Sequence, residues 1–223
     1  MMTNLFSIFD PSSSLFFSLN WMSSLMMLIL IPYTFWLIPS RYNMMWLYLM
    51  NFMNNEFKIL INKNAQGSKI IFTSMFMFIM INNFMGLFPY IFTSSSHLAM
   101  SLSISLPLWL SLMMFGWLKY NNNMFAHMVP LGTPKILMPF MVMIESISNL
   151  IRPGTLAIRL TANMIAGHLL ITLMSSPGPK LNMIMLMIMI MSQILLLILE
   201  SAVAIIQAYV FSILSTLYSN EIK

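Results

Sequence analysis

Long intervals without a formal charge most limit how this chain of 223 residues can fold. Apart from a histidine, no side chain between residues 70 and 118 is charged, and none is charged between residues 11 and 40. Only 7% of all residues are charged, whereas a soluble domain usually has about a quarter. So few charges cannot cover the surface of a 25.7 kDa globule, so we expect lipid to be the solvent.

The apolar stretches predict an all-α membrane protein with about five membrane-embedded helices, because a helical span needs about 20 apolar residues. A single membrane domain, residues 1–223, would hold the first span at 15–39, the second at 70–91 and the third at 97–118. Two longer helices are expected at 136–174 and 181–218. A Pro-Gly-Pro run lies between them and favours a hairpin turn.

Segment 41–66 carries charges as well as apolar residues, unlike the predicted spans. On a helical wheel several of its Asn residues and Lys58 fall on one side. This pattern predicts an amphipathic helix that lies in the membrane interface. An ordinary polar connecting loop is the alternative.

Positive charges gather on one side of the predicted membrane. With five spans, the 41–69 and 119–135 loops lie on the same side as the C-terminus. That side holds seven cations and the other side has Lys180; the seven are Arg41, Lys58, Lys63, Lys69, Lys119, Lys135 and Lys223. The positive-inside rule therefore predicts the N-terminus outside and the C-terminus inside. No Lys or Arg precedes Arg41, which argues against an import presequence, and the Met-rich, Cys-free composition is typical of translation inside a mitochondrion.

The last two apolar stretches are too long to cross a bilayer upright. Residues 181–218 form about 57 Å of helix at about 1.5 Å per residue. A perpendicular span needs about half of that, and an ordinary tilt of about 20° does not absorb the excess. We therefore expect two steeply tilted helices in an antiparallel hairpin that presents a broad flank to a neighbour.

Ionisable side chains within the apolar stretches are concentrated in this hairpin. They are Glu145, Arg152, Arg159, His168 and Glu200, and the first three spans contain no formally charged residue. Burying such a group in lipid costs roughly 2.5–3.5 kcal/mol on insertion scales, so these residues usually mark an ion pathway. The sequence therefore places the chemistry in residues 136–218.

Helical spacing arranges these groups in two stripes. Residues at intervals of seven lie within about 40° of one another on a helix; one such set is Glu145, Arg152 and Arg159, and another is Gln193, Glu200 and Gln207. Glu and His can relay protons, whereas an arginine effectively never releases one. The pattern predicts two proton wires separated by an arginine, and a mobile carboxylate on a partner subunit that carries protons past it.

Three segments of the sequence carry a resemblance to a known family. They read IRPGTLAIRLTANMIAGH at 151–168, NNFMGLFPY at 82–90 and VPLGTP at 129–134. They resemble signature segments of subunit a (subunit 6) of mitochondrial F-type ATP synthase, in its arthropod-like form. The resemblance extends over essentially the whole chain.

The resemblance implies a role for several side chains. Arg159 would face the rotating ring of c subunits, ionise a ring carboxylate and block a proton short circuit. His168 and Glu200 would line a half-channel, a polar path reaching partway through the membrane, from the intermembrane space, and Glu145 would serve the matrix-side half-channel. Asn163 and Gln207 would be polar positions near the arginine. The resemblance gives no role to Arg152 or Gln193.

The function implied is that of a proton-translocating stator subunit, in the mitochondrial inner membrane, which couples proton flow to rotation without catalysing a reaction itself. Its N-terminus would lie in the intermembrane space and its C-terminus on the matrix side. The implied partners are the c-ring, peripheral-stalk and other membrane subunits, and lipid; nucleic acid, cofactors and metals are not expected. A secondary transporter and a non-conducting respiratory-complex subunit are the alternatives. His97 and His127 lie in connecting segments and are expected at the surface.

Overall fold

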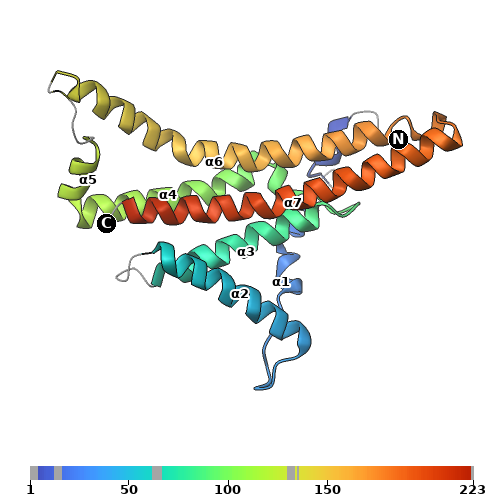
Figure 1. Cartoon of the computed structure of the whole chain (residues 1–223), viewed down its shortest axis with the longest axis horizontal. Coiled ribbons are helices and arrows are strands. Elements are labelled where there is room, and N and C mark those ends of the chain that lie inside the picture. Colours follow the sequence, from blue (N-terminus) through green and yellow to red (C-terminus); the bar gives the residue numbers. More distant parts are fainter. Residues whose placement is uncertain (1–4, 13–16, 62–66, 130–133, 135, 222–223) are drawn as a thin grey trace.

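The computed structural model describes residues 5–12, 17–61, 67–129, 134 and 136–221, and all regular elements in these ranges are helical. The helices form an elongated bundle (Figure 1). Four described helices are long and apolar enough to cross a membrane. They are α3 (Lys69–Gly86), α4 (Leu98–Lys119), α6 (Met138–Ser175) and α7 (Met183–Glu221). The all-α membrane class predicted from the sequence is therefore confirmed.

The N-terminal region differs from the expected span at 15–39. Two short 3-10 helices, η1 (Leu5–Phe9) and η2 (Leu19–Leu25), precede α1 (Met27–Leu30). Together η2 and α1 extend about 22 Å at most, at about 2.0 Å per residue of 3-10 helix and about 1.5 Å per residue of α-helix, which is too short for a span. The helix stops because Ile31 has an extended backbone, φ −74° and ψ 118°, as is usual for a residue before a proline. The described part of the chain thus has four helices that are both long and apolar enough to cross a membrane, where about five were expected.

Helix α2 (Arg41–Leu60) begins where the amphipathic helix was expected and ends earlier than 66. Ser40 caps its start, because the Ser40 side chain accepts a hydrogen bond from the backbone N–H of Asn43. Residues 62–66 of the expected helix lie outside the described ranges. The other end of α2 is tied to α7 by a hydrogen bond that the Asn220 amide donates to the Leu60 carbonyl.

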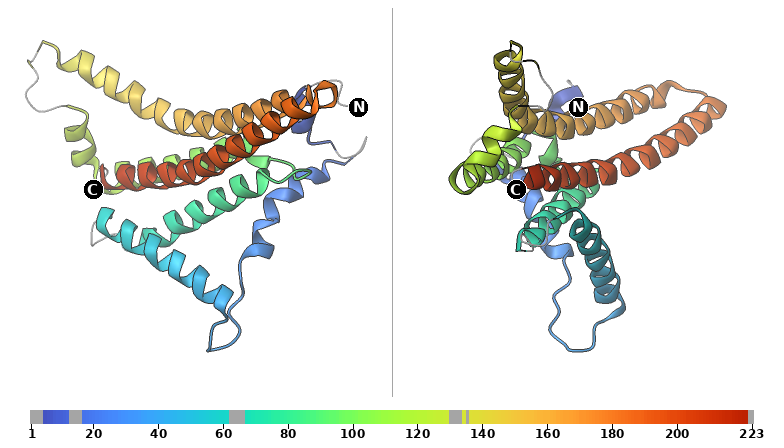
Figure 2. Two further views of the ribbon diagram at one scale, coloured as in Figure 1. Left: turned by 45° about the vertical axis from the view of Figure 1, so that its right-hand side comes forward. Right: turned by 60° about the vertical axis from the view of Figure 1, so that its left-hand side comes forward.

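The hydrophobic core lies where α2, α3, α6 and α7 meet. Each helix contributes a face whose buried residues recur at helical spacing, such as Phe72, Phe76 and Ile79 of α3. Phe57 of α2 is fully buried in this core. Figure 2 shows α2 and α3 on one side of the α6–α7 hairpin, while α4 packs against α6.

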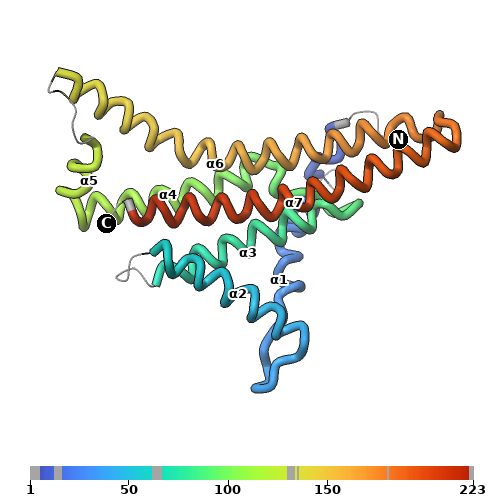
Figure 3. Tube along the Cα trace, viewed as in Figure 1, coloured from blue at the N-terminus to red at the C-terminus, as the bar shows by residue number. Residues whose placement is uncertain are grey.

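Helices α6 and α7 form the antiparallel hairpin that the sequence predicts, joined through η5 (Gly178–Lys180). Figure 3 shows α6 as one continuous but curved path. Pro153 lies inside α6 and cannot donate the helical hydrogen bond to the carbonyl of Asn149, which favours a bend there. A short helix not expected from the sequence, α5 (Asn121–His127), follows α4 and brings His127 toward the start of the hairpin.

The helix termini and the connecting turns lie at the two opposite ends of the bundle. Helix α3 begins, and α4 and α7 end, at the end of the bundle near α5 (Figure 1). The hairpin turn and the N-terminal region lie at the opposite end. Lys69 and Lys119 are therefore at the same end as the last turn of α7, which is the charge distribution that the orientation prediction requires.

Candidate functional site

The ionisable residues of the hairpin form two clusters, one on each side of Arg159 along α6. Glu145 and Arg152 lie toward the start of the helix, and His168 lies beyond Arg159 and contacts Glu200 of α7. At about 1.5 Å per residue, Arg152 is about 10 Å before Arg159 and His168 about 13 Å after it. The two protonatable clusters are thus well separated.

His168 and Glu200 face each other across the hairpin. Their Nε2 and Oε1 atoms are 3.9 Å apart, and the two side chains are 13% and 5% exposed. These buried atoms and Oε2 of Glu200 find no hydrogen-bond partner among the described residues, so the pair has free capacity to bind water. The rings of Phe9 and His168 are nearly perpendicular, with their centroids 6.3 Å apart.

Gly167 makes room for the Glu200 carboxylate. An ideal Cβ at position 167 would lie 2.7 Å from Cδ of Glu200 and still closer to Oε1. Real Cβ atoms essentially never come this close to another heavy atom. A residue without a side chain is therefore needed here for Glu200 to lie beside His168.

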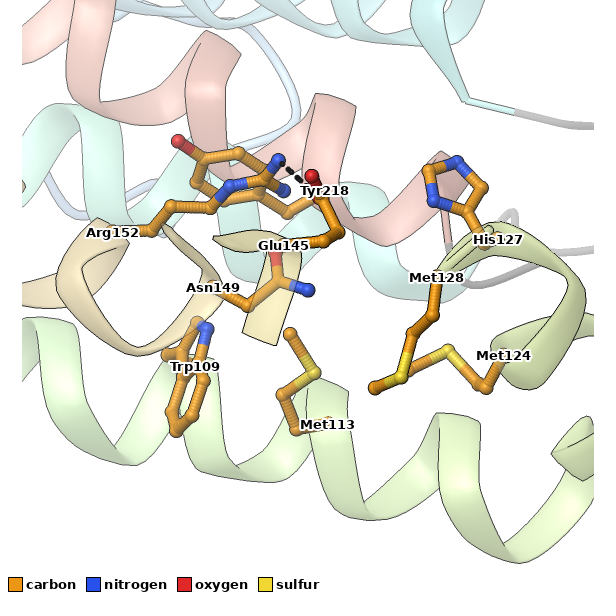
Figure 4. A pocket seen from close by; sticks show the side chains of 9 residues that line it. All are labelled: Trp109, Met113, Met124, His127, Met128, Glu145, Asn149, Arg152 and Tyr218. Atoms are coloured by element: carbon orange, nitrogen blue, oxygen red, sulfur yellow. Dashed lines mark ion pairs between the residues drawn. The ribbon is translucent and has the colours of Figure 1, made fainter. Parts of the chain in front are cut away.

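Glu145 and Arg152 form the second cluster, shown in Figure 4. The Arg152 Nη2 and Glu145 Oε1 atoms are 3.5 Å apart, and the guanidinium carbon lies 4.9 Å from the centre of the Tyr218 ring of α7. Both groups line a cavity of about 30 Å³, which is room for about two water molecules. His127 of α5 and Trp109 of α4 also line it.

Arg159 differs from Arg152 in having no ion-pair partner among the residues that the structure describes. Its side chain is exposed and makes no hydrogen bond or ion pair with a described residue. Glu145 is too far away to pair with it, because fourteen residues of helix span about 21 Å. The two arginines of the expected common stripe lie in different environments: Arg152 is half-buried and lines a cavity, whereas Arg159 is exposed.

Two small exposed residues follow Arg159 on its own helix. Ala162 and Ala166 lie one and two turns further along α6, and both are exposed. The contacts His168–Glu200 and Arg152–Tyr218 fix the register of the two helices. Interpolation between these two contacts places Arg159 level with about residue 210 of α7. Small side chains let another helix approach a face closely.

The other predicted polar residues are half-buried within the hairpin. Asn163 follows Arg159 by one turn, and Gln207 lies within one turn of the level of Arg159. Gln193 lies two turns from Glu200, toward the hairpin turn. The structure describes no side-chain hydrogen bond for these three residues.

A buried polar layer between α3, η4 (Ser94–Ser96) and α4 was not expected from the sequence. Asn83 is fully buried and its amide finds no partner among the described residues. The surface position expected for His97 is also wrong: His97 is half-buried, and its ring centroid lies 5.2 Å from those of the tilted Trp21 and Phe92 rings. His127 is exposed, as expected. No spacing rule links residues so far apart in the chain.

The geometry suits the movement of protons in two separate steps. Carboxylate and imidazole groups accept and release protons, whereas the exposed guanidinium between the two clusters does not. A mobile acid from outside the chain would be attracted to Arg159 and would connect the clusters. The described residues contain no group of three or more His, Asp or Glu side chains able to hold a metal ion.

Comparison with known proteins gives a consistent result over the whole chain. Residues 15–220 match the family model described as ATP synthase A chain. The chain is similar to "ATP synthase subunit a" of Drosophila melanogaster, with 60% identity over 224 residues, and of Locusta migratoria, with 61% identity over 224 residues. It is also 58% identical over 226 residues to the protein of that name from Anopheles quadrimaculatus. In each comparison the alignment covers 100% of both chains.

Proposed function

The chain belongs to the ATP synthase A chain family, and we propose on that basis that its α6–α7 hairpin carries the proton path of the membrane sector. As a member, it is a proton-translocating membrane subunit of an F-type ATP synthase. The proposal concerns which side chains carry the proton, which surface meets the rotor and how the chain lies in the membrane.

Arg159 separates two half-channels and faces a ring of c subunits. The observation that carries this assignment is the exposed guanidinium without a partner in the described chain, between two protonatable clusters. A cation in a low-dielectric setting strongly favours the ionised form of an approaching carboxylate. Each ring carboxylate therefore loses its proton on reaching Arg159, and no proton passes directly from one half-channel to the other.

Protons enter through the His168–Glu200 pair, neutralise a ring carboxylate, travel with the ring through lipid and leave past Glu145. Asn163 and Gln207 line the passage near Arg159. Each proton that crosses the membrane yields about 2.3 kcal/mol per 100 mV of potential. The ring transmits this work to a separate catalytic part, so the chain itself is not catalytic.

The proposed setting is the mitochondrial inner membrane. The hairpin lies steeply tilted, with the N-terminus in the intermembrane space and the C-terminus on the matrix side, as the clustering of cations favours. Helix α2 lies in the membrane interface, with Met53 and Phe57 turned toward the protein core. Peripheral-stalk and other membrane subunits and lipid cover the remaining apolar surface.

Cysteine cross-linking in the assembled complex tests the rotor-facing surface. Ala162→Cys is expected to form a disulfide with a cysteine placed beside the carboxylate of the ring subunit. Met114→Cys is the matched control, because Met114 is also exposed but lies on α4. Cross-linking at position 114 and not at position 162 would contradict the proposed surface.

A further inference from the structure

Arg152 occupies a different environment from Arg159 although both lie on α6. Its side chain is 25% exposed and that of its ion-pair partner Glu145 is 32% exposed. Ion pairs at an open surface contribute little, because water screens them and the long side chains lose freedom. A pair that is mostly enclosed is held more firmly, so the orientation of Glu145 depends on Arg152.

Arg152 is in turn held by the opposite helix. Its guanidinium lies over the Tyr218 ring and also pairs with Glu145 (Figure 4). An arginine over an aromatic ring gains attraction to the electron-rich face, and its planar group stacks where a lysine would not. This contact fixes Arg152 to α7, so Glu145 of α6 is positioned by a residue that bridges the two helices.

The cavity beside this pair contains the groups that a proton path needs. Apart from Arg152, its titratable lining groups are Glu145, Tyr218 and His127. The buried side-chain oxygen of Asn149 and the indole nitrogen of Trp109 have no partner among the described residues and can bind water. Water in the cavity would therefore lie against Glu145, with the exposed His127 on the outer side.

We infer that Arg152 is a positioning residue for the exit half-channel, clamped on Tyr218 so that Glu145 keeps one carboxylate oxygen directed at the cavity. The inference rests on the proposed function of Glu145. In each transfer the carboxylate accepts a proton from one water molecule and returns it to another. Arg152 keeps its own protons throughout, so it orients the relay and takes no part in it.

A double-mutant cycle in the assembled ATP synthase tests this role. The complex is reconstituted in lipid vesicles, and proton flux per assembled complex is measured for Arg152→Gln, Glu145→Gln and the double variant. Each single change is expected to slow the flux by about tenfold, and the double variant to be no slower than Glu145→Gln, because contacting residues that act together are not additive. Arg152→Lys, which keeps the charge and loses the stacking, is expected to recover part of the flux.

Lys119→Gln is the matched control. Lys119 also lies over an aromatic ring, that of Phe115 at 5.2 Å, but it is absent from the cavity lining. Its replacement is expected to leave the flux unchanged. The flux of Arg152→Gln should also change its dependence on the pH of the exit compartment and keep its dependence on the entry compartment, which a general structural defect would not do.

The outcomes distinguish a failure of the role inferred for Arg152 from a failure of the role proposed for Glu145. The clamp is overturned if Arg152→Gln assembles normally and keeps wild-type flux. It is also overturned if the effects of the two single changes multiply in the double variant. Either result leaves the role of Glu145 intact. Wild-type flux in Glu145→Gln overturns the exit role of Glu145 and the clamp with it. If Arg152→Gln fails to assemble, Tyr218→Leu replaces it, and wild-type flux in that variant overturns the clamp.

Discussion

Substituting Gly167 by alanine tests the entry pair through a known displacement. The added Cβ would lie 2.7 Å from Cδ of Glu200, whereas ordinary contact begins at 3.4 Å. Cδ of Glu200 must therefore move by at least about 0.7 Å, and Oε1, which lies closer still to the added Cβ, must move further. Since the group that moves is the flexible end of the side chain, folding is affected little and the carboxylate is displaced from its position beside His168.

The effect on function is expected to be much larger than the effect on stability. A displacement of about 1 Å between reacting groups can slow a reaction by about a hundredfold. We therefore expect Gly167→Ala to reduce passive proton flux through the membrane sector by about ten- to a hundredfold. Flux into vesicles, driven by an imposed potential and divided by the amount of assembled complex, measures this directly.

Gly154→Ala on the same helix is the control. No heavy atom lies within 4 Å of an ideal Cβ at position 154, and alanine favours a helix over glycine by about 1 kcal/mol. This variant is expected to keep wild-type flux. If Gly167→Ala also keeps it, at normal assembly, then Glu200 does not work from the position beside His168 and the reasoning is refuted.

Two further predictions concern the pair and the core. Glu200→Gln removes the protonatable group at the entry, so it should slow proton flux by about a hundredfold or more; unchanged flux would remove Glu200 from the path. Phe57→Ala empties a fully buried site between α2 and the rest of the bundle. We therefore expect the protein to lose about 3–5 kcal/mol of stability and α2 to be proteolysed faster. The control Phe52→Ala, at an exposed position of the same helix, should change neither.

The charge pattern predicted the bounds of the long helices well, because a lipid environment excludes charged side chains from the middle of a helix. The expected helices at 136–174 and 181–218 lie within three residues of the bounds of α6 and α7, since charges and a Pro-Gly-Pro run end them. The first span could not be placed this way. Hydrophobicity alone permits a helix through 15–39, but Pro32 forces Ile31 into an extended conformation.

The contacts among the ionisable side chains were only partly predictable from the sequence. Spacing by seven identified both arginines and both glutamates as members of polar stripes, but it placed Arg152 and Arg159 on a common face. In the structure Arg159 is exposed, whereas Arg152 contacts the ring of Tyr218, which is 66 residues away in the sequence. Contacts between distant segments depend on helix packing, and no local pattern encodes them.

ATP-driven proton pumping by a complex that carries Arg159→Ala tests the central claim most directly. The exposed guanidinium is proposed to ionise each ring carboxylate and to keep the two half-channels apart. Its loss is therefore expected to abolish pumping while the complex still assembles, because Arg159 makes no hydrogen bond or ion pair with the part of the chain that the structure describes. Pumping at the wild-type rate in a normally assembled complex would contradict the account.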